Sequence, residues 1–268
     1  MLRIIGKFFL HLLMTLFLTA LTQIGGIVYL LTLLILAITK RRFKFQNLLL
    51  FSTLYLVATF LITPPLARQF GREPVQHSDR IRPTNYATVL LNRNYVTPRM
   101  NRLLQATAND KNLINNNIQI RYLDACFPFI KRFPLLPHLS HHDGRKIDIS
   151  LIYETSAGEL SNRKKSVSGY GVFVDIQKGE PDQVSICKKQ GYWQYDFPQY
   201  LTFGSINSDL KFSKRGTKIL IDGFLKQSAT GKILIEPHLK QRLRLQHGKI
   251  RYHGCHAVRH DDHIHVQL

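Results

Sequence analysis

Two long apolar runs near the N-terminus constrain this chain more than any other feature. The first extends from Phe8 to Ile38 and the second, "NLLLFSTLYLVATFLITPPLA", from Asn47 to Ala67. Each run is long enough to cross a bilayer, which takes about 20 helical residues. The apolar region of a cleaved signal peptide has only about 7–15 residues. Residues 1–67 are therefore predicted to be a membrane anchor of two transmembrane helices, or of three if the first run turns at Gly25 and Gly26.

Positive charge clusters between the two runs, and clustered Lys and Arg stay on the cytoplasmic side of a membrane. The cluster consists of Lys40, Arg41, Arg42 and Lys44. With that loop inside, the second run exports everything after Ala67 to the periplasmic or extracytoplasmic side of the inner membrane. Four arginines just beyond the second run favour the opposite topology: Arg68, Arg72, Arg80 and Arg82.

The net charge of +20 also bears on the partners of the exported part. The first 72 residues hold eight Lys or Arg and no Asp or Glu, which leaves a net charge of +12 on the remainder. A basic domain suits cell-wall polymers, membrane surfaces or nucleic acid, although a solvated basic surface without a polyanionic partner is as common. Export conflicts with a nucleic-acid partner, so none is expected.

Three cysteines are too few for a disulfide framework. They are Cys126, Cys187 and Cys255. One disulfide outside the cytoplasm would leave one thiol over, and the sequence does not select the pair.

The remainder of the chain is predicted to be a linker followed by one domain. Residues 68–86 lack periodicity and are predicted to be the linker, and residues 87–268 the domain. Thr97 and Pro98 are typical of a helix start, and helical spacing continues to Ala108. Alternating or short apolar stretches predict strands at 118–123, 146–154, 169–177, 231–237 and 262–268, and two further helices are expected at 216–228 and 238–246. The intermixed elements indicate an α+β fold with a mainly antiparallel sheet and flanking helices.

Histidines cluster in the second half of this domain. Ten of the twelve lie at or after His138. In "PHLSHHDGRKID", His141 precedes Asp148 by seven residues, and a positive φ at Gly144 would fold the loop back over the strand end. His142 and Asp143 are expected to be polar loop residues.

The last residues, "HDDHIHVQL", supply a second group. His263 and His265 alternate on a predicted strand, so both face one side about 7 Å apart, while Asp262 faces the other side. A catalytic zinc takes three His or carboxylate ligands and keeps one position for water. His141, Asp148 and His265 complete such a set, and His263 is the candidate base.

Several other polar residues receive no role at the site. A His-X-His pair alone is usually a surface feature. Asp261 is expected to lie in a loop, and His238 and His247 are expected at the surface. No role is assigned to His253 or His256.

Both groups resemble the motifs of one known family. "SHHDGRKID" is similar to the SHxxGxxxD motif of the penicillin-insensitive murein endopeptidases, relatives of the zinc D-Ala-D-Ala carboxypeptidases, and "HDDHIHVQL" is similar to their HxxHxH ending. "GKILIEPHLKQRL" resembles the strand and helix before that ending. The resemblance extends from about Ile118 to the C-terminus, and the membrane segments are not part of the usual family pattern.

The resemblance implies roles for individual residues. His141, Asp148 and His265 match the family's zinc ligands, and His138 matches a histidine near that site. His263 and His260 match histidines that stand where related carboxypeptidases place a catalytic glutamate, and Asp262 lies three residues before the last ligand. A further active-site aspartate of the family has two candidate counterparts, Asp196 and Asp209.

Together these features predict a membrane-anchored zinc metallopeptidase that hydrolyses peptide bonds of peptidoglycan stem peptides or cross-links. Whether it is an endopeptidase or a D,D- or L,D-carboxypeptidase stays open, as does the choice of His263, His260 or Asp262 as the base. Arg121 is predicted to bind a substrate carboxylate. The alternative is a non-catalytic cell-wall-binding module on the same fold.

Overall fold

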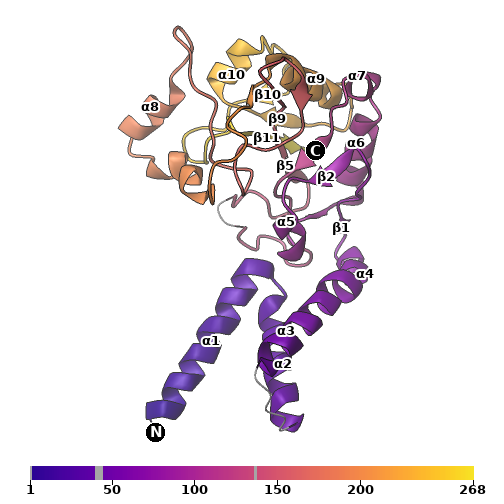
Figure 1. The fold of residues 1–268 in the computed structure, drawn as a ribbon, viewed down its shortest axis with the longest axis vertical. Coiled ribbons are helices and arrows are strands. Elements are labelled where there is room, and N and C mark those ends of the chain that lie inside the picture. Colours follow the sequence, from indigo (N-terminus) through magenta and orange to yellow (C-terminus); the bar gives the residue numbers. More distant parts are fainter. Residues whose placement is uncertain (1, 40–44, 136–137) are drawn as a thin grey trace.

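The N-terminal region forms a group of apolar helices below a mixed domain in the computed structural model, which describes residues 2–39, 45–135 and 138–268 (Figure 1). The helices are α1 (Leu2–Thr22), α2 (Gly25–Thr39), α3 (Gln46–Val57), the π-helical η1 (Ala58–Ile62) and α4 (Thr63–Gln69). By length and composition, Arg3–Thr22 and the continuous helix Gln46–Gln69 could each cross a membrane, whereas α2 has only 15 residues. The two candidate spans fit a membrane anchor.

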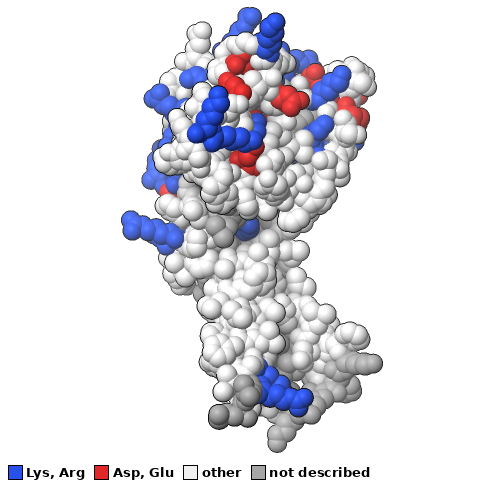
Figure 2. Space-filling view, turned by 90° about the vertical axis from the view of Figure 1, so that its left-hand side faces the viewer, with Lys and Arg blue, Asp and Glu red and all other residues white. Residues whose placement is uncertain are grey.

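These helices are almost free of charged side chains, which gather instead on the domain (Figure 2). The predicted orientation depends on Lys40, Arg41, Arg42 and Lys44, and those residues lie outside the described part of the chain.

The chain turns between α1 and α2 at Gln23, which has a positive φ of 66°. The two glycines predicted to make that turn instead begin α2 and let it approach α1 closely, because a Cβ on Gly26 would lie 1.9 Å from Thr19 Oγ1. Gln23 Oε1 accepts a hydrogen bond of 2.7 Å from the backbone N–H of Phe129. The tip of this helix pair therefore contacts the domain.

A six-stranded sheet organises the domain, in the order β10-β9-β11-β5-β4-β2. The strands are β2 (Ile81–Pro83), β4 (Ile120–Tyr122), β5 (Lys146–Ser150), β9 (Lys232–Leu234), β10 (Ile250–Arg251) and β11 (His263–Gln267). The three central pairings are antiparallel, but β2 with β4 and β10 with β9 are parallel.

The sheet is therefore mixed, and the prediction of a mainly antiparallel sheet holds only for its centre. Both parallel pairs arise because helices lie between their strands along the chain, and such crossovers bring the chain back in the same direction. The helices α6 (Pro98–Ala108) and α7 (Lys111–Asn115) lie between β2 and β4, and α10 (Pro237–Arg242) lies between β9 and β10.

The two faces of the central strands carry different kinds of side chains. Ile149 and Ile264 pair across β5 and β11 and are fully buried in the main core. Residues of α6 and of α9 (Lys214–Leu225), among them Leu104 and Phe224, belong to the same core. Because side chains alternate along a strand, Asp148 and its register partner His265 lie on the opposite face. That second face carries the histidine groups.

Several predicted elements are confirmed. Thr97 caps α6, with its side chain accepting from the backbone N–H of Met100. Strands β4, β9 and β11 lie within their predicted ranges, and helices α9 and α10 begin one or two residues earlier and end three or four residues earlier than predicted. The predicted strand at 146–154 divides into β5 and β6 (Tyr153–Glu154), and β6 belongs to a separate three-stranded sheet with β7 (Leu160–Ser161) and β8 (Lys211–Phe212).

Two predictions are wrong. Residues 169–177 form no strand, because the backbone takes positive φ at Gly169 and Gly171. The backbone N–H of Val174 donates to the carbonyl of Asp261, which does not belong to a strand. The segment 68–86 is no linker, since β1 (Glu73–Pro74) pairs with β3 (Tyr95–Val96) and β2 is an edge of the main sheet. Arg72 is 2% exposed there and donates to the carbonyls of Phe127 and His142.

The remaining helices are α5 (Ala87–Leu90), α8 (Gln183–Lys189) and the 3-10 helix η2 (Trp193–Leu201). A disulfide joins Cys187 on α8 to Cys255, which resolves the pairing that the sequence left open. Cys126 keeps a buried free thiol, and burial raises its pKa.

Candidate metal centre

Three side chains from the two sequence motifs meet on the second face of the sheet. His265 lies on β11 directly opposite Asp148 on β5, and its Nδ1 is 2.9 Å from Asp148 Oδ1. His141 arrives from the preceding loop, with its Nε2 3.0 Å from His265 Nδ1 and 3.1 Å from Asp148 Oδ1. Gly144 has the predicted positive φ, 71°, which turns that loop into β5. All three residues are at most 2% exposed.

The hydrogen bonds around His141 decide which atom faces the centre. Its Nδ1 lies 2.7 Å from the carbonyl oxygen of Ala125, which can only accept, so in the neutral ring Nδ1 carries the proton and Nε2 offers a lone pair. Asp148 Oδ1 also offers lone pairs, and burial is the main cause that lowers the pKa of His265, to about 4. Such a set of donor atoms suits a cation.

The distances also fit a metal ion. Tetrahedral zinc with bonds of about 2.0–2.1 Å to nitrogen and oxygen needs donor atoms roughly 3.3 Å apart. The three edges of 2.9, 3.0 and 3.1 Å require an outward shift of only a few tenths of an ångström. The fixed tautomer of His141 is the kind of support that metal-binding histidines usually have.

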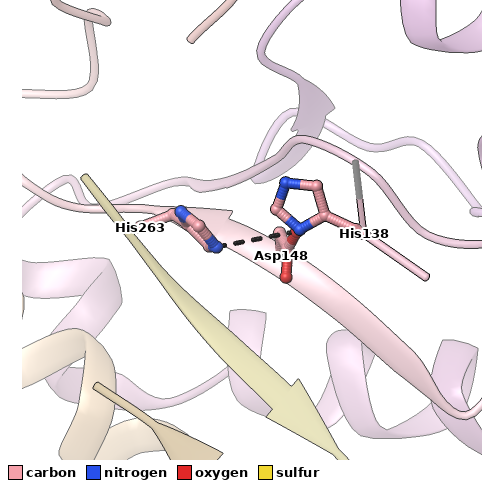
Figure 3. Close-up of side chains that lie close together, drawn as sticks. All are labelled: His138, Asp148 and His263. Carbon is pink, nitrogen blue, oxygen red and sulfur yellow. Dashed lines mark ion pairs between the residues drawn. The ribbon is translucent and has the colours of Figure 1, made fainter. Parts of the chain in front are cut away.

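Three further side chains surround the second oxygen of Asp148. Tyr170 donates its hydroxyl proton to Oδ2 over 3.0 Å, and His138 Nδ1 lies 2.8 Å from the same atom. His263 Nε2 is 3.7 Å away, and Figure 3 shows the His263 and His138 rings beside the carboxylate. Burial favours the neutral acid, but the neighbouring histidines outweigh it and lower the pKa of Asp148 well below its usual value. Asp148 is therefore an anion within a ring of histidines.

His263 and Asp262 form a pair behind this carboxylate. Asp262 Oδ1 contacts His263 Nδ1, so the other ring nitrogen, Nε2, faces Asp148. Burial opposes charge on the ring, but Asp148 and Asp262 raise the pKa of His263 to about 9. In this arrangement His263 is a proton donor at neutral pH, and Asp262 orients it instead of facing the three donor atoms. A cation bound to Asp148 would remove part of that effect and make His263 more available as a base.

His260 belongs to a neighbouring group with Glu236 and His253. Glu236 Oε1 accepts from the backbone N–H of His260 and lies 2.9 Å from His253 Nε2, while Tyr195 donates to Oε2 over 2.6 Å. The His260 ring lies 4.7 Å from that of His263 and 5.8 Å from that of His265. Burial, and then His253, lower the pKa of His260 well below its usual value. His260 is thus a neutral ring beside the three donor atoms and not one of them.

A cavity of about 920 Å³ opens onto these groups. His138, Tyr170, His253 and His260 contribute to its lining, together with the ion pair of Arg93 and Asp124 (2.8 Å). The three candidate metal ligands are not among the residues that line the cavity.

The structure does not bring Arg121 to this cavity. It lies half-buried on β4 beside its register partner Arg82, and burial followed by Arg82 lowers its pKa. Among the described lining residues, Arg93 is the arginine. Asp196 pairs with Lys188 and Arg259, and Asp209 pairs with Arg163, so neither aspartate lies with the histidines.

One expectation about bystanders is wrong. His238 is fully buried instead of lying at the surface, whereas Asp261 lies in a loop as expected and is fully buried there. His238 Nε2 lies 3.2 Å from the carbonyl oxygen of Val174, and Arg259 binds the carboxylate of Asp261. His247 is exposed as expected.

Sequence reasoning missed Tyr170, Glu236 and His253. Tyr170 was placed on a strand that does not form. Glu236 had a usable signal, because it follows β9 directly and β9 pairs with β11, which carries His265. A carboxylate just beyond that strand end was therefore a candidate for the site.

Compared with known proteins, the chain matches no family model and no curated protein.

Proposed function

We propose that the chain is a membrane-anchored zinc metallopeptidase that hydrolyses peptide bonds of peptidoglycan stem peptides or cross-links. One observation carries the proposal. His141, Asp148 and His265, which are far apart in the sequence, place three donor atoms within 3.1 Å of one another in a buried site beside a cavity. The resemblance of the same residues to the murein endopeptidase motifs supplies the substrate class.

The side chains around the three donor atoms have the chemistry that such a reaction needs. A zinc ion held by His141, Asp148 and His265 would polarise the scissile carbonyl and lower the pKa of a bound water. His138 Nε2 and His263 Nε2 are buried without a hydrogen-bond partner among the described residues. Buried polar atoms normally have partners, so these two are available to a substrate or water group. Asp262 holds His263 in one orientation for proton transfer.

The location proposed is the inner membrane with the domain on its extracytoplasmic side. The disulfide Cys187–Cys255 supports this side, because disulfides persist in oxidising compartments and are rare in the cytosol. Arg72, one of the arginines that favoured the opposite topology, is buried within the domain and bound to carbonyls, which weakens that argument.

The test uses the full chain in detergent or nanodiscs. Zinc is measured after dialysis, and new termini are sought by mass spectrometry in digested muropeptides. We expect about one zinc at this site and zinc-dependent cleavage. His141→Ala and His265→Ala should each lose both, whereas His247→Ala, which removes an exposed histidine outside the groups, should keep both.

Three results would count against the proposal. Zinc retention without cleavage, combined with binding to sacculi, would identify a non-catalytic cell-wall-binding module. Equal cleavage by wild type and His265→Ala would show that cleavage does not depend on the three proposed ligands. A C-terminal reporter fusion that is active only in the cytoplasm would overturn the location.

A further inference from the structure

The cavity beside the histidines has a largely apolar lining, although the proposed substrate is a polar peptide. The 3-10 helix η2 supplies Trp193, Phe197 and Leu201, and the loops add Leu139 and Phe203. Three of these side chains are open to solvent, with exposures of 58% for Leu139, 75% for Trp193 and 77% for Phe203. Exposed apolar surface of this kind usually marks a ligand, partner or membrane contact.

The wall of the same cavity rests on a candidate membrane span. Ala87 and Thr88 of α5, with Leu91 just after it, line the cavity. Tyr55 on α3 donates its hydroxyl proton to the carbonyl of Leu90 over 2.6 Å. Asn92 Nδ2 in turn lies 3.2 Å from the Tyr55 hydroxyl and 3.4 Å from Thr59 Oγ1. Figure 1 shows α5 on the side of the domain that faces the helices.

The contact between Tyr55 and α5 lies far from both ends of the apolar helix. Tyr55 lies inside the apolar helix Gln46–Gln69, nine residues from one end and fourteen from the other. At 1.5 Å per residue it is roughly 14 Å from the first end and roughly 21 Å from the second. If this helix crosses the bilayer, α5 touches it away from both ends, so the cavity wall adjoins the hydrocarbon region.

We propose that this cavity binds the hydrocarbon chain of an amphiphilic substrate that is held in the membrane, while the polar peptide part of the same molecule reaches His138 and His260. The substrate class is thus a peptide covalently joined to a long hydrocarbon chain. The proposal rests on the peptidase function for the peptide part. The apolar lining, the exposed aromatic residues and the contact with the span carry the hydrocarbon part.

The alternative occupants fit less well. A water-soluble peptide would leave most of the apolar lining unused. A free bilayer lipid would use the apolar lining but not the histidines or the Arg93–Asp124 ion pair in the same cavity. A tethered substrate uses both, and membrane confinement raises its effective concentration at the site.

The chain provides its own probe, because Trp193 is its only tryptophan and lines the cavity. The full chain is reconstituted in nanodiscs and mixed with a stem peptide carrying a dibromohexadecanoyl chain, whose bromine atoms quench tryptophan at short range. We expect quenching by this peptide, and none by the acetylated peptide or by the same discs made with dibromo lipids. Quenching by dibromo lipids alone would show a lipid-filled cavity and overturn the proposal, as would no quenching by any probe.

Two variants sharpen the test. Phe203→Asp places a carboxylate in the exposed apolar lining and should reduce quenching and raise KM for the acylated peptide at least tenfold. Ile186→Asp, on α8 and 46% exposed outside the lining, should change neither. Equal effects of both variants would contradict a specific hydrocarbon site.

The outcomes separate this proposal from the peptidase function. Quenching needs no turnover, so quenching without cleavage of any peptide would refute the peptidase and leave the hydrocarbon site standing. Zinc-dependent cleavage of acetylated and acylated peptides with equal kcat/KM, without quenching, would refute the hydrocarbon site alone.

Discussion

Gly171 connects the candidate centre to the wall of the cavity, so a single added methyl group there tests both. Its backbone N–H donates to Asp262 Oδ2, and Asp262 in turn contacts His263. The residue has a φ of +82°, and a Cβ built on it would lie 2.2 Å from the carbonyl oxygen of Pro198 in η2 and 2.8 Å from Thr202 Cγ2. The backbone carbonyl cannot rotate away as a flexible side chain could.

The magnitude has two parts. An alanine in the left-handed region costs about 1–2 kcal/mol, and overpacking against fixed neighbours adds typically 1–3 kcal/mol. Gly179 is a matched control, because its φ is +86° but no atom lies within 4 Å of the added Cβ. Gly171→Ala should therefore be less stable than Gly179→Ala by about 2 kcal/mol, or roughly 4–8 °C in Tm for a domain of this size.

The assay compares the thermal unfolding and the peptidase activity of both variants in the full chain. Gly171→Ala should also lose at least tenfold in kcat/KM, because the loop that supports Asp262 and His263 has to shift. Equal Tm and equal activity in the two variants would refute the close packing of Gly171 against η2 and its role in positioning His263.

Two further predictions concern stability. Replacing both Cys187 and Cys255 with serine should lower the free energy of unfolding by about 4 kcal/mol, because the disulfide closes a loop with a sequence separation of 68; in the unreduced, denatured wild type only Cys126 should react with maleimide, and labelling of all three cysteines would contradict the pairing. The hydrogen bonds from Arg242 lower the pKa of Glu180 to about 2, so the pair should stabilise the fold fully above about pH 4.5 and lose this effect as the pH falls toward 2. At pH 7, Glu180→Gln should therefore lower the free energy of unfolding by at most about 3 kcal/mol, a limit that solvent screening reduces further. The difference in Tm between wild type and variant should shrink at pH 3; a difference in Tm that is independent of pH would contradict this.

The local patterns in the sequence predicted the elements that carry the three donor atoms. Alternation identified β5 and β11, and the spacing of His141, Gly144 and Asp148 indicated a loop that folds back on its strand. What the sequence could not give is the register that sets His265 opposite Asp148, because register depends on contacts between segments 117 residues apart. The ligand set inferred from the two motifs, which the family resemblance matches, required these side chains to meet but did not specify the register.

The failures have a common physical cause. The segment around Tyr170 alternates like a strand, but Gly169 and Gly171 take positive φ so that the chain can approach η2 and Asp262. His238 is a polar residue at a helix start, yet tertiary packing buries it completely. The edge strand β2 was not predicted, because only three of its residues pair and the segment around it shows no periodicity. In each case long-range contacts override the local pattern.

The identity of the metal ligands is the central claim, and zinc X-ray absorption tests it most directly. The zinc-loaded full chain should show nitrogen and oxygen neighbours at about 2.0–2.1 Å and no sulfur at about 2.3 Å. This signal should disappear in Asp148→Asn and persist in Glu236→Gln, which alters only the neighbouring group. A sulfur shell, or zinc that stays in Asp148→Asn and leaves Glu236→Gln, would place the ion elsewhere and contradict the assignment.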